Sequence, residues 1–296
     1  MQQVDLLILG AGWTSTFLIP LLKERNYTFA ATTTDGRKVA GSETLKWRFE
    51  PNDSSNEKHG DSGLGSLPLA RHVLITFPLT TASQTDFLVE SYLAGHSKTR
   101  DQVGFIQFGS TGIWQIPQKT IWVSRRSPYN TSSPRAVAED ALLQRGGCVL
   151  NLAGLWGGER DPRNWVERVA KTKEEVKGKK SLHLVHGLDV ARAVVAVMRE
   201  WETAKGQRWM LTDGFVYDWW SLFVGWADAA KKHQGEEGTA GDRVDDMPSD
   251  QARWVLELMK EEKIWALPRS MEVLGRCYFG REFYDTFGLA PLKARV

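Results

Sequence analysis

The sequence predicts an α/β protein with a doubly wound parallel sheet and a small, mostly helical C-terminal lobe. Short apolar runs typical of buried strands recur over residues 1–215, separated by helical patterns. The first run leads into a glycine turn and then an apolar helical segment. Beyond residue 215, aromatic and amphipathic helical patterns predominate. We therefore expect a Rossmann-like domain over 1–215 and a C-terminal lobe over 216–296. Segments near 150–180 are further candidates for that lobe.

The first element is an apolar run over 4–9 that ends in Gly10-Ala11-Gly12. Such a turn brings the backbone close to a pyrophosphate, and the next helix offers free N–H groups to the anion. A third glycine is absent, but the small Ser15 in its place still permits close packing of helix and strand. The alternative is a glycine turn that binds nothing. The residues expected to contact a dinucleotide here are Gly10, Gly12, Trp13, Thr14 and Ser15.

The second strand-like run, over 27–32, leads into Thr33, Asp35 and Arg37, where such a unit contacts the adenosine ribose. Asp35 lies about twenty residues after the turn, as in NAD-binding units, but past the expected strand end. Arg37 with threonine neighbours suits the 2′-phosphate of NADP. We therefore favour NADP(H), with NAD(H) as the alternative. A solvated turn whose charges face water explains the same residues.

Two later turns lie at the expected carboxyl edge of the sheet, where ligands bind in open α/β folds. Phe77 and Pro78 follow the apolar run over 72–77, and Ser110 and Thr111 follow the run over 103–108. A hydroxyl at this edge is suited to bind a substrate carbonyl or a nicotinamide. The alternative for Ser110 and Thr111 is a turn in which both hydroxyls satisfy backbone groups.

The remaining elements follow in order. Further strands are expected at 45–49, 121–123, 148–152, 181–186 and 207–212. Helices are expected at 82–94, 135–144, 161–180, from residue 189, and at 217–230, 253–263 and 268–276. Polar loops are expected at 51–66 and 231–250, and the aromatic tail over 279–289 is expected to pack against the body.

Composition excludes several classes of protein. The 38 basic and 36 acidic residues nearly balance, so nothing favours a nucleic-acid or membrane partner. No run approaches the ~20 apolar residues of a membrane span, and the N-terminus lacks a basic segment typical of a signal peptide. Cys148 and Cys277 have apolar neighbours typical of core thiols, and no metal-ligand spacing is present. We expect a cytoplasmic protein without a bound metal.

The order of these pieces resembles the extended and atypical short-chain dehydrogenase/reductase superfamily, most of all its YeeZ-like, NAD-dependent epimerase/dehydratase-type branch. The resemblance covers about residues 4–215. It implies a Rossmann-like domain and a small C-terminal substrate lobe. The stretches that carry it are 10–15, 109–114, 135–139, 152–157 and 184–193.

One departure from this superfamily concerns catalysis. Active members use a Tyr-x-x-x-Lys pair, in which the lysine lowers the pKa of the tyrosine. None of the six tyrosines here is followed by lysine at that spacing. Aligned on Ala138-Glu139, the resemblance puts Arg135 at the lysine position and Thr131 at the tyrosine position. Arg135 is then expected to hold a ribose or a substrate anion. Tyr129 is the nearest phenol in sequence to the missing one.

Two functions of different classes follow. The first is an NAD(P)-dependent redox or epimerase-type enzyme acting on a small carbonyl or hydroxyl metabolite, with Ser110, Thr111 and Tyr129 as catalytic candidates. The second is a non-catalytic NADP(H)-binding sensor or scaffold, or a non-redox enzyme on the same fold. The expected partners are a small-molecule substrate and a second copy of the chain, because superfamily members often dimerise through helices such as 82–94 and 135–144.

Overall fold

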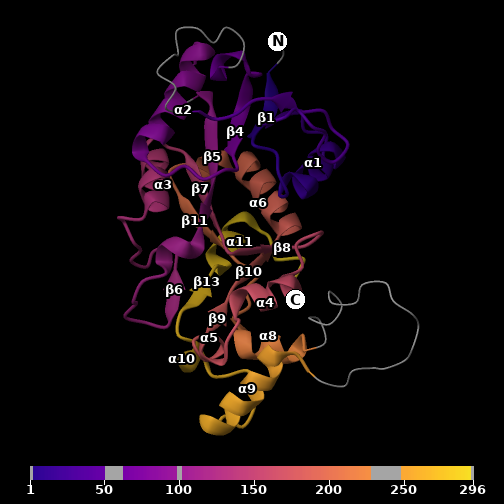
Figure 1. Ribbon diagram of the computed structural model, residues 1–296. Coiled ribbons are helices and arrows are strands. Elements are labelled where there is room, and N and C mark those ends of the chain that lie inside the picture. Colours follow the sequence, from indigo (N-terminus) through magenta and orange to yellow (C-terminus); the bar gives the residue numbers. More distant parts are fainter. Residues whose placement is uncertain (1–2, 51–62, 99–101, 228–247, 295–296) are drawn as a thin grey trace, which may run out of the picture.

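The computed structural model describes residues 3–50, 63–98, 102–227 and 248–294. Its centre is a seven-stranded sheet in the order β11-β7-β5-β4-β1-β2-β3 (Figure 1). All six pairings between its neighbouring strands are parallel. The strands are β1 (Val4–Leu9), β2 (Phe29–Thr33), β3 (Leu45–Lys46), β4 (Ala70–Ile75), β5 (Gly104–Ser110), β7 (Cys148–Leu152) and β11 (Arg208–Leu211). The order reverses between β1 and β4, so the topological switch point of a doubly wound sheet lies there. The expected α/β fold is confirmed.

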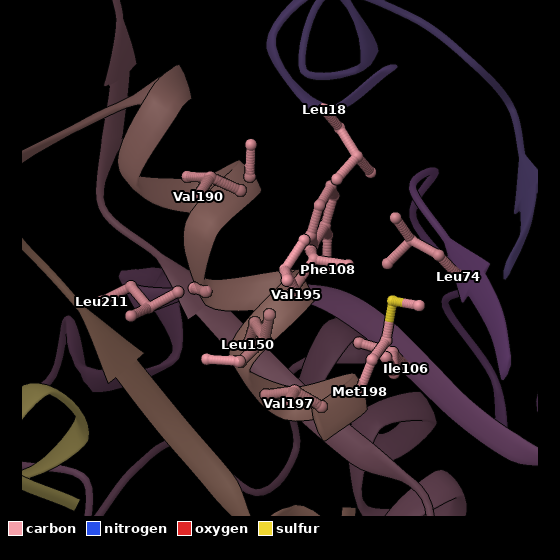
Figure 2. Close-up of a cluster of buried hydrophobic side chains, with 14 of the residues drawn as sticks. Leu18, Leu74, Ile106, Phe108, Leu150, Val190, Val195, Val197, Met198 and Leu211 are labelled. Carbon is pink, nitrogen blue, oxygen red and sulfur yellow. The ribbon is translucent and has the colours of Figure 1, made fainter. Parts of the chain in front are cut away.

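Helices cover both faces of the sheet (Figure 1). The helices α1 (Ser15–Glu24) and α6 (Gly187–Arg199) pack on one face, and α2 (Ala82–Gly95) and α3 (Pro134–Gln144) pack on the other. Figure 2 shows Val195 and Met198 of α6 against Leu74, Ile106 and Leu150 of three strands. These side chains are almost fully buried, at roughly 1.5–3 kcal/mol each. No helix in the described ranges is both long and apolar enough to cross a bilayer.

A separate hydrophobic cluster lies away from the sheet. It joins α4 (Val166–Val169) and α5 (Lys173–Lys177) to α8 (Trp219–Gly225) and α9 (Asp250–Glu261). These helices lie at the end of the molecule opposite to the N-terminus (Figure 1). Residues of α4 and α5 therefore share this cluster with the C-terminal helices. The domain boundary at residue 215 stays a prediction.

Three small sheets, three short α-helices and three 3-10 helices complete the described elements; the 3-10 helices are Leu64–Ser66, Thr111–Trp114 and Pro162–Trp165. The pairs are β8 (Gly154–Trp156) with β10 (Leu184–His186), β9 (Ser181–Leu182) with β12 (Tyr217–Asp218), and β6 (Trp122–Ser124) with β13 (Cys277–Phe279). The short helices are α7 (Trp201–Ala204), α10 (Met271–Leu274) and α11 (Arg281–Phe287). The predicted strand over 181–186 is therefore two strands with His183 between them.

The long helix predicted over 161–180 is wrong. A 3-10 helix over Pro162–Trp165 and α4 are followed by Ala170, whose φ of −153° and ψ of 108° are extended. Thr172 then starts α5 by accepting a hydrogen bond from the Glu175 N–H at 3.2 Å. The helices predicted over 217–230 and 268–276 are also shorter, as α8 and α10. Most of the loops predicted over 51–66 and 231–250 lies outside the described residues.

The C-terminal tail returns to the sheet. Phe283 and Phe287 of α11 pack edge-on against Trp209 of β11, with ring centroids 5.8 and 5.1 Å away. The Tyr284 hydroxyl donates to the Thr212 carbonyl at 2.8 Å. A Cβ on Gly280 would lie 2.7 Å from the Thr212 Oγ1, so the chain passes very close to its own earlier exit from the sheet. The prediction that the aromatic tail packs against the body is confirmed.

Candidate functional site

A cavity of about 860 Å³ opens at the carboxyl ends of β1, β4, β5 and β7, beside the switch point. This is where doubly wound sheets bind ligands. The lining residues are Gly10, Gly12, Trp13, Thr14, Thr76, Phe108, Gly109, Ser110, Arg135, Leu152, Ala153, Leu155, Arg160, Trp165 and Arg168. Five of the residues singled out in the sequence as cofactor-binding therefore lie around one space, together with Ser110. We call this space the main cavity.

Gly10 and Gly12 in the glycine turn have different surroundings. Gly10 has a φ of +85°, and a Cβ there would lie 2.9 Å from the Thr76 Oγ1. A Cβ on Gly12 would meet nothing nearer than the Gly10 carbonyl at 3.9 Å. The fold thus requires glycine at position 10, whereas it leaves room for a side chain at position 12. A ligand in the main cavity is a sufficient reason for glycine at position 12.

The turn presents unpaired donors to the main cavity. Among the described residues, the backbone N–H groups of Gly12, Trp13 and Thr14 have no acceptor. Thr14 precedes α1 without a side-chain cap, so the positive end of the helix dipole is also open. The Ser15 hydroxyl is buried without a partner behind the turn, and its small side chain lets α1 pack closely. The backbone here is suited to hold an anion.

Three arginines add positive charge. Arg135, Arg160 and Arg168 line the main cavity, and no acidic residue of the described ranges does. Within the described ranges, none of the three lies within 4.0 Å of a carboxylate. Arg135 donates from Nη2 to the Phe108 carbonyl at 3.1 Å, and the Arg160 guanidinium lies 4.4 Å from the centre of the Trp13 ring. The Trp13 indole N–H in turn donates to the Gly157 carbonyl at 3.2 Å.

Of the two neighbouring residues Ser110 and Thr111, only Ser110 lines the main cavity. The Ser110 Oγ accepts a hydrogen bond from the Gly112 N–H at 3.0 Å, while its residue still lines the main cavity. Thr111 is 6% exposed, does not line the main cavity, and donates from its hydroxyl to the Leu152 carbonyl at 3.3 Å. Both hydroxyls thus contact the backbone, as the alternative interpretation of this turn expected. Ser110 alone combines that role with access to the main cavity.

The buried Glu139 carboxylate holds the Ser110 backbone in place, a role that the sequence did not predict. Glu139 is fully buried and accepts from the Ser110 N–H at 3.2 Å and from the Asn151 side-chain amide at 2.8 Å. Arg208 lies 3.3 Å from the same carboxylate. Burial raises the pKa of Glu139, against the opposing effect of these partners. A Cβ on Gly109 would lie 2.5 Å from the Asn151 amide nitrogen, so glycine there allows this contact.

Residues expected at the adenosine ribose follow β2. The Thr33 hydroxyl accepts from the Gly36 N–H at 2.9 Å. Asp35 and Arg37 form an exposed ion pair with an Oδ1–Nη1 distance of 3.0 Å. The Arg37 backbone N–H is the main cause that lowers the pKa of Asp35. None of the three residues lines the main cavity.

Phe77 and Pro78 lie beside the main cavity and not on its wall. The Phe77 ring stacks on Phe49, with centroids 5.4 Å apart, and Pro78 is exposed. The neighbouring Thr76 lines the main cavity instead, and its hydroxyl donates to the Leu9 carbonyl at 3.0 Å. Phe77 closes the space behind Gly10, where a Cβ would lie 3.0 Å from its ring.

Tyr129 belongs to a different part of the molecule. Its hydroxyl donates to Asp140 at 2.9 Å, and the Arg208 guanidinium lies 4.4 Å from the centre of its ring. Burial raises the pKa of this phenol. Tyr129 lines neither the main cavity nor the smaller cavity next to it. Closeness in sequence to the missing tyrosine position therefore did not bring this phenol to the site.

The smaller cavity, of about 380 Å³, adjoins the main cavity and shares Ser110, Leu152 and Ala153 with it. We call it the side cavity. The other lining residues are Thr111, Gly112, Gln115, Gly154, Ser181, Leu182, His183, Trp219, Arg276 and Tyr278. Its polar residues His183, Arg276 and Tyr278 were not predicted as site residues. No group of three or more histidine, cysteine, aspartate or glutamate side chains in the described ranges is placed to hold a metal ion.

Comparisons with known proteins show which solved structures share this fold. No family model and no curated protein matches the sequence. A functionally unknown conserved protein from Silicibacter pomeroyi is 17% identical, with a TM-score of 0.61 over 99% of this chain and 95% of that chain. A putative NAD-dependent epimerase/dehydratase from Methylobacillus flagellatus is 14% identical, with a TM-score of 0.56 over 86% and 92%. A short-chain dehydrogenase/reductase superfamily protein from Agrobacterium tumefaciens with bound NAD is 12% identical, with a TM-score of 0.56 over 91% and 94%. The chain thus has the fold of these proteins.

Proposed function

We propose that the main cavity binds a nicotinamide dinucleotide, NADP(H) by preference and NAD(H) as the alternative. The observation that carries this proposal is the turn at Gly12. Its free N–H groups and the open space above its Cα face a space lined by three arginines and no carboxylate. This combination suits a pyrophosphate. The NAD bound to the Agrobacterium protein of the same fold supports the choice of ligand.

We further propose that the chain is an atypical, YeeZ-like member of the short-chain dehydrogenase/reductase superfamily that acts on a small carbonyl or hydroxyl metabolite. The cofactor would supply or accept the hydride. Gly12, Trp13 and Thr14 would hold its pyrophosphate, and Arg135 would hold a ribose hydroxyl or a neighbouring anion. Ser110, braced by Glu139, would orient the substrate oxygen.

The lack of an evident proton donor favours a second function, a nucleotide sensor or a non-redox enzyme. No Tyr-x-x-x-Lys pair exists in the sequence, and Tyr129 points its hydroxyl at Asp140. The Ser110 Oγ already accepts a hydrogen bond from the Gly112 N–H. A serine hydroxyl is also a weak acid, so Ser110 alone suits the orienting of a carbonyl better than the transfer of a proton.

Binding is tested by calorimetry and thermal unfolding with NADPH and with NADH. At 100 times the Kd, a ligand adds about 2.7 kcal/mol to the stability, which corresponds to a melting-temperature rise of several degrees. Gly12→Ala is expected to unfold at the wild-type temperature without cofactor, because its methyl group contacts no other part of the protein closely. The same methyl group would occupy the space of the pyrophosphate, so NADPH is expected to bind at least about tenfold more weakly.

Gly63→Ala is the matched control. Gly63 has a φ of −78° and open space around its Cα, so its variant is expected to match the wild type in stability and NADPH affinity. Wild-type affinity for both nucleotides in Gly12→Ala, or no binding of either by the wild type at millimolar concentration, would refute the proposal. A screen of carbonyl compounds for NADPH oxidation, repeated with Ser110→Ala, then separates the enzyme from the sensor.

A further inference from the structure

Among the described residues, the lining of the side cavity contains hydrogen-bond donors and positive charge but no acidic residue. Arg276 and His183 are joined by the polar residues Ser110, Thr111, Gln115 and Ser181, and Leu182, Trp219 and Tyr278 supply apolar surface. It opens beside Ser110, the residue that it shares with the main cavity. A volume of about 380 Å³ lies in the range of small-molecule sites, which combine apolar walls with a few fixed polar groups.

His183 is held as a neutral donor. It is 4% exposed, and its Nε2 accepts a hydrogen bond from the Tyr278 backbone N–H at 2.9 Å. Burial, with the nearby charge of Arg276, lowers the pKa of His183 to about 3. The ring is therefore neutral at physiological pH, and because Nε2 accepts, Nδ1 carries the hydrogen. Among the described residues, nothing accepts a hydrogen bond from this Nδ1.

Arg276 is a cation without a counterion. In the described part of the chain no carboxylate lies within 4.0 Å of it, and its Nε is buried without a partner. Two hydrogen bonds fix its backbone. The Arg276 carbonyl accepts from the Ser181 hydroxyl at 2.6 Å, and the Cys277 N–H donates to the Ile121 carbonyl at 2.7 Å. The guanidinium lies 5.4 Å from the centre of the Tyr278 ring. A half-buried cation of this kind gains most from an anion that pairs with it.

We propose that the side cavity binds the carboxylate of a small organic acid, which Arg276 holds by its guanidinium and His183 by its Nδ1–H. A single cation beside a neutral donor matches a monoanion, whereas a phosphate dianion calls for a second positive charge, which the described lining residues do not supply. The rest of the acid would reach Ser110, so the metabolite is a hydroxy or oxo acid. The position of the reacting carbon beside the cofactor rests on the proposed function. The binding of the acid by Arg276 and His183 does not depend on it.

The test compares acids with their amides by calorimetry. The probes are L-lactate, L-malate and 3-phenyllactate, each with its amide, together with phenyl phosphate, with and without saturating NADPH. At least one acid is expected to bind at least about tenfold more tightly than its amide. Arg276→Gln is expected to remove this difference in affinity by weakening the binding of the acid, while Arg276→Lys retains part of the difference.

Arg281→Gln is the matched control, because Arg281 is exposed and pairs with Asp285 at 3.0 Å. It is expected to bind the acid as the wild type does. Equal binding of acids and amides, an unchanged acid affinity in both Arg276 variants, tighter binding of phenyl phosphate, or no binding of any acid at about 10 mM overturns the proposal. NADPH affinity in each variant keeps the two proposals apart: cofactor binding without acid binding refutes only this one.

Discussion

Asp35 and Arg37 form an ion pair immediately after β2, and the two charges act in opposite directions on the choice of cofactor. The Arg37 Nη1 lies 3.0 Å from one carboxylate oxygen of Asp35 and 3.2 Å from the other, and both side chains are exposed. Asp35 would repel the 2′-phosphate of NADPH, whereas Arg37 would attract it. The pair therefore offers a direct test of NADP(H) preference.

Replacement of Arg37 by alanine is expected to lower the affinity for NADPH relative to NADH by about tenfold, because a charge-assisted contact to phosphate is lost. Asp35→Asn is expected to shift the ratio the other way, and calorimetric Kd values for both cofactors measure it. An unchanged ratio in Arg37→Ala would remove Arg37 from cofactor selection.

Asp213 gives the stability a pH dependence. It is 3% exposed and lies just beyond β11, where it accepts from the Tyr217 hydroxyl at 2.5 Å and the Phe215 N–H at 3.0 Å. Burial raises its pKa from 3.8 to about 6, despite these bonds. The folded chain therefore holds this proton more tightly than the unfolded chain does. The resulting stabilisation is complete below pH 3.8 and is lost as the pH rises through about 6.

Between about pH 4 and 7 the Asp213 contribution to the free energy of unfolding is expected to fall by up to about 3 kcal/mol. Asp213→Asn cannot titrate, so its urea-unfolding free energy should change less over this range than that of the wild type. Parallel pH profiles for the two proteins would contradict the shifted pKa.

At the same scale, sequence reasoning found those site residues that belong to a local pattern. Gly10, Gly12, Trp13 and Thr14 form one turn, and Ser110 ends a strand, so spacing alone predicted that they meet at one edge of the sheet. Arg135 was expected near a ligand only through the family resemblance, and Arg160, Arg168, Arg276 and His183 were not predicted. The unpredicted residues come from loops and short elements whose place depends on contacts far apart in sequence, such as the bond from Tyr278 to His183.

Strands were more predictable than helices at the scale of elements. The central strands β1, β5 and β7 are short apolar runs, as parallel strands buried on both faces require, whereas the edge strand β3 is exposed. Helical periodicity failed over 161–180, because Thr172 caps a new helix where the pattern continues. The helix α11 was predicted only as an aromatic tail.

Phe283 is the central buried side chain of α11, at 1% exposure, and it contacts Trp209. Phe283→Ala is expected to lower the free energy of unfolding by about 3–5 kcal/mol, because it leaves a cavity against the sheet. Phe279→Ala is the control; this side chain is 46% exposed, and the expected loss is below about 1 kcal/mol. Equal losses in urea unfolding would show that α11 does not stabilise the sheet.

At the scale of the whole molecule, the resemblance leads us to propose a dimer through α2 and α3. The two helices already pack together, with Arg145 placed 2.6 Å from Asp86. Val137 of α3 is 36% exposed and lies on the outer surface. An apolar residue at this position suits an interface between two copies.

Light scattering is expected to give about twice the chain mass of 33.3 kDa. Val137→Glu should shift the protein toward the monomer, whereas Val273→Glu, at an exposed position on α10, should not. A monomeric wild type at micromolar concentration, or a Val137→Glu variant that stays dimeric, would refute this interface.

The contact between Thr212 and Gly280 has a consequence for how such a protein can diversify. The chain leaves the sheet after β11 and later returns to pack beside the same point, where the Tyr284 hydroxyl donates to the Thr212 carbonyl. The segment between Thr212 and Gly280 therefore begins and ends at one place on the sheet. It supplies Arg276 and Trp219 to the side cavity, while the glycine turn and Arg135 lie outside it. Replacing this segment with that of another protein of this fold is expected to change the part of the side cavity that Arg276 and Trp219 form, while His183 and the glycine turn stay in place.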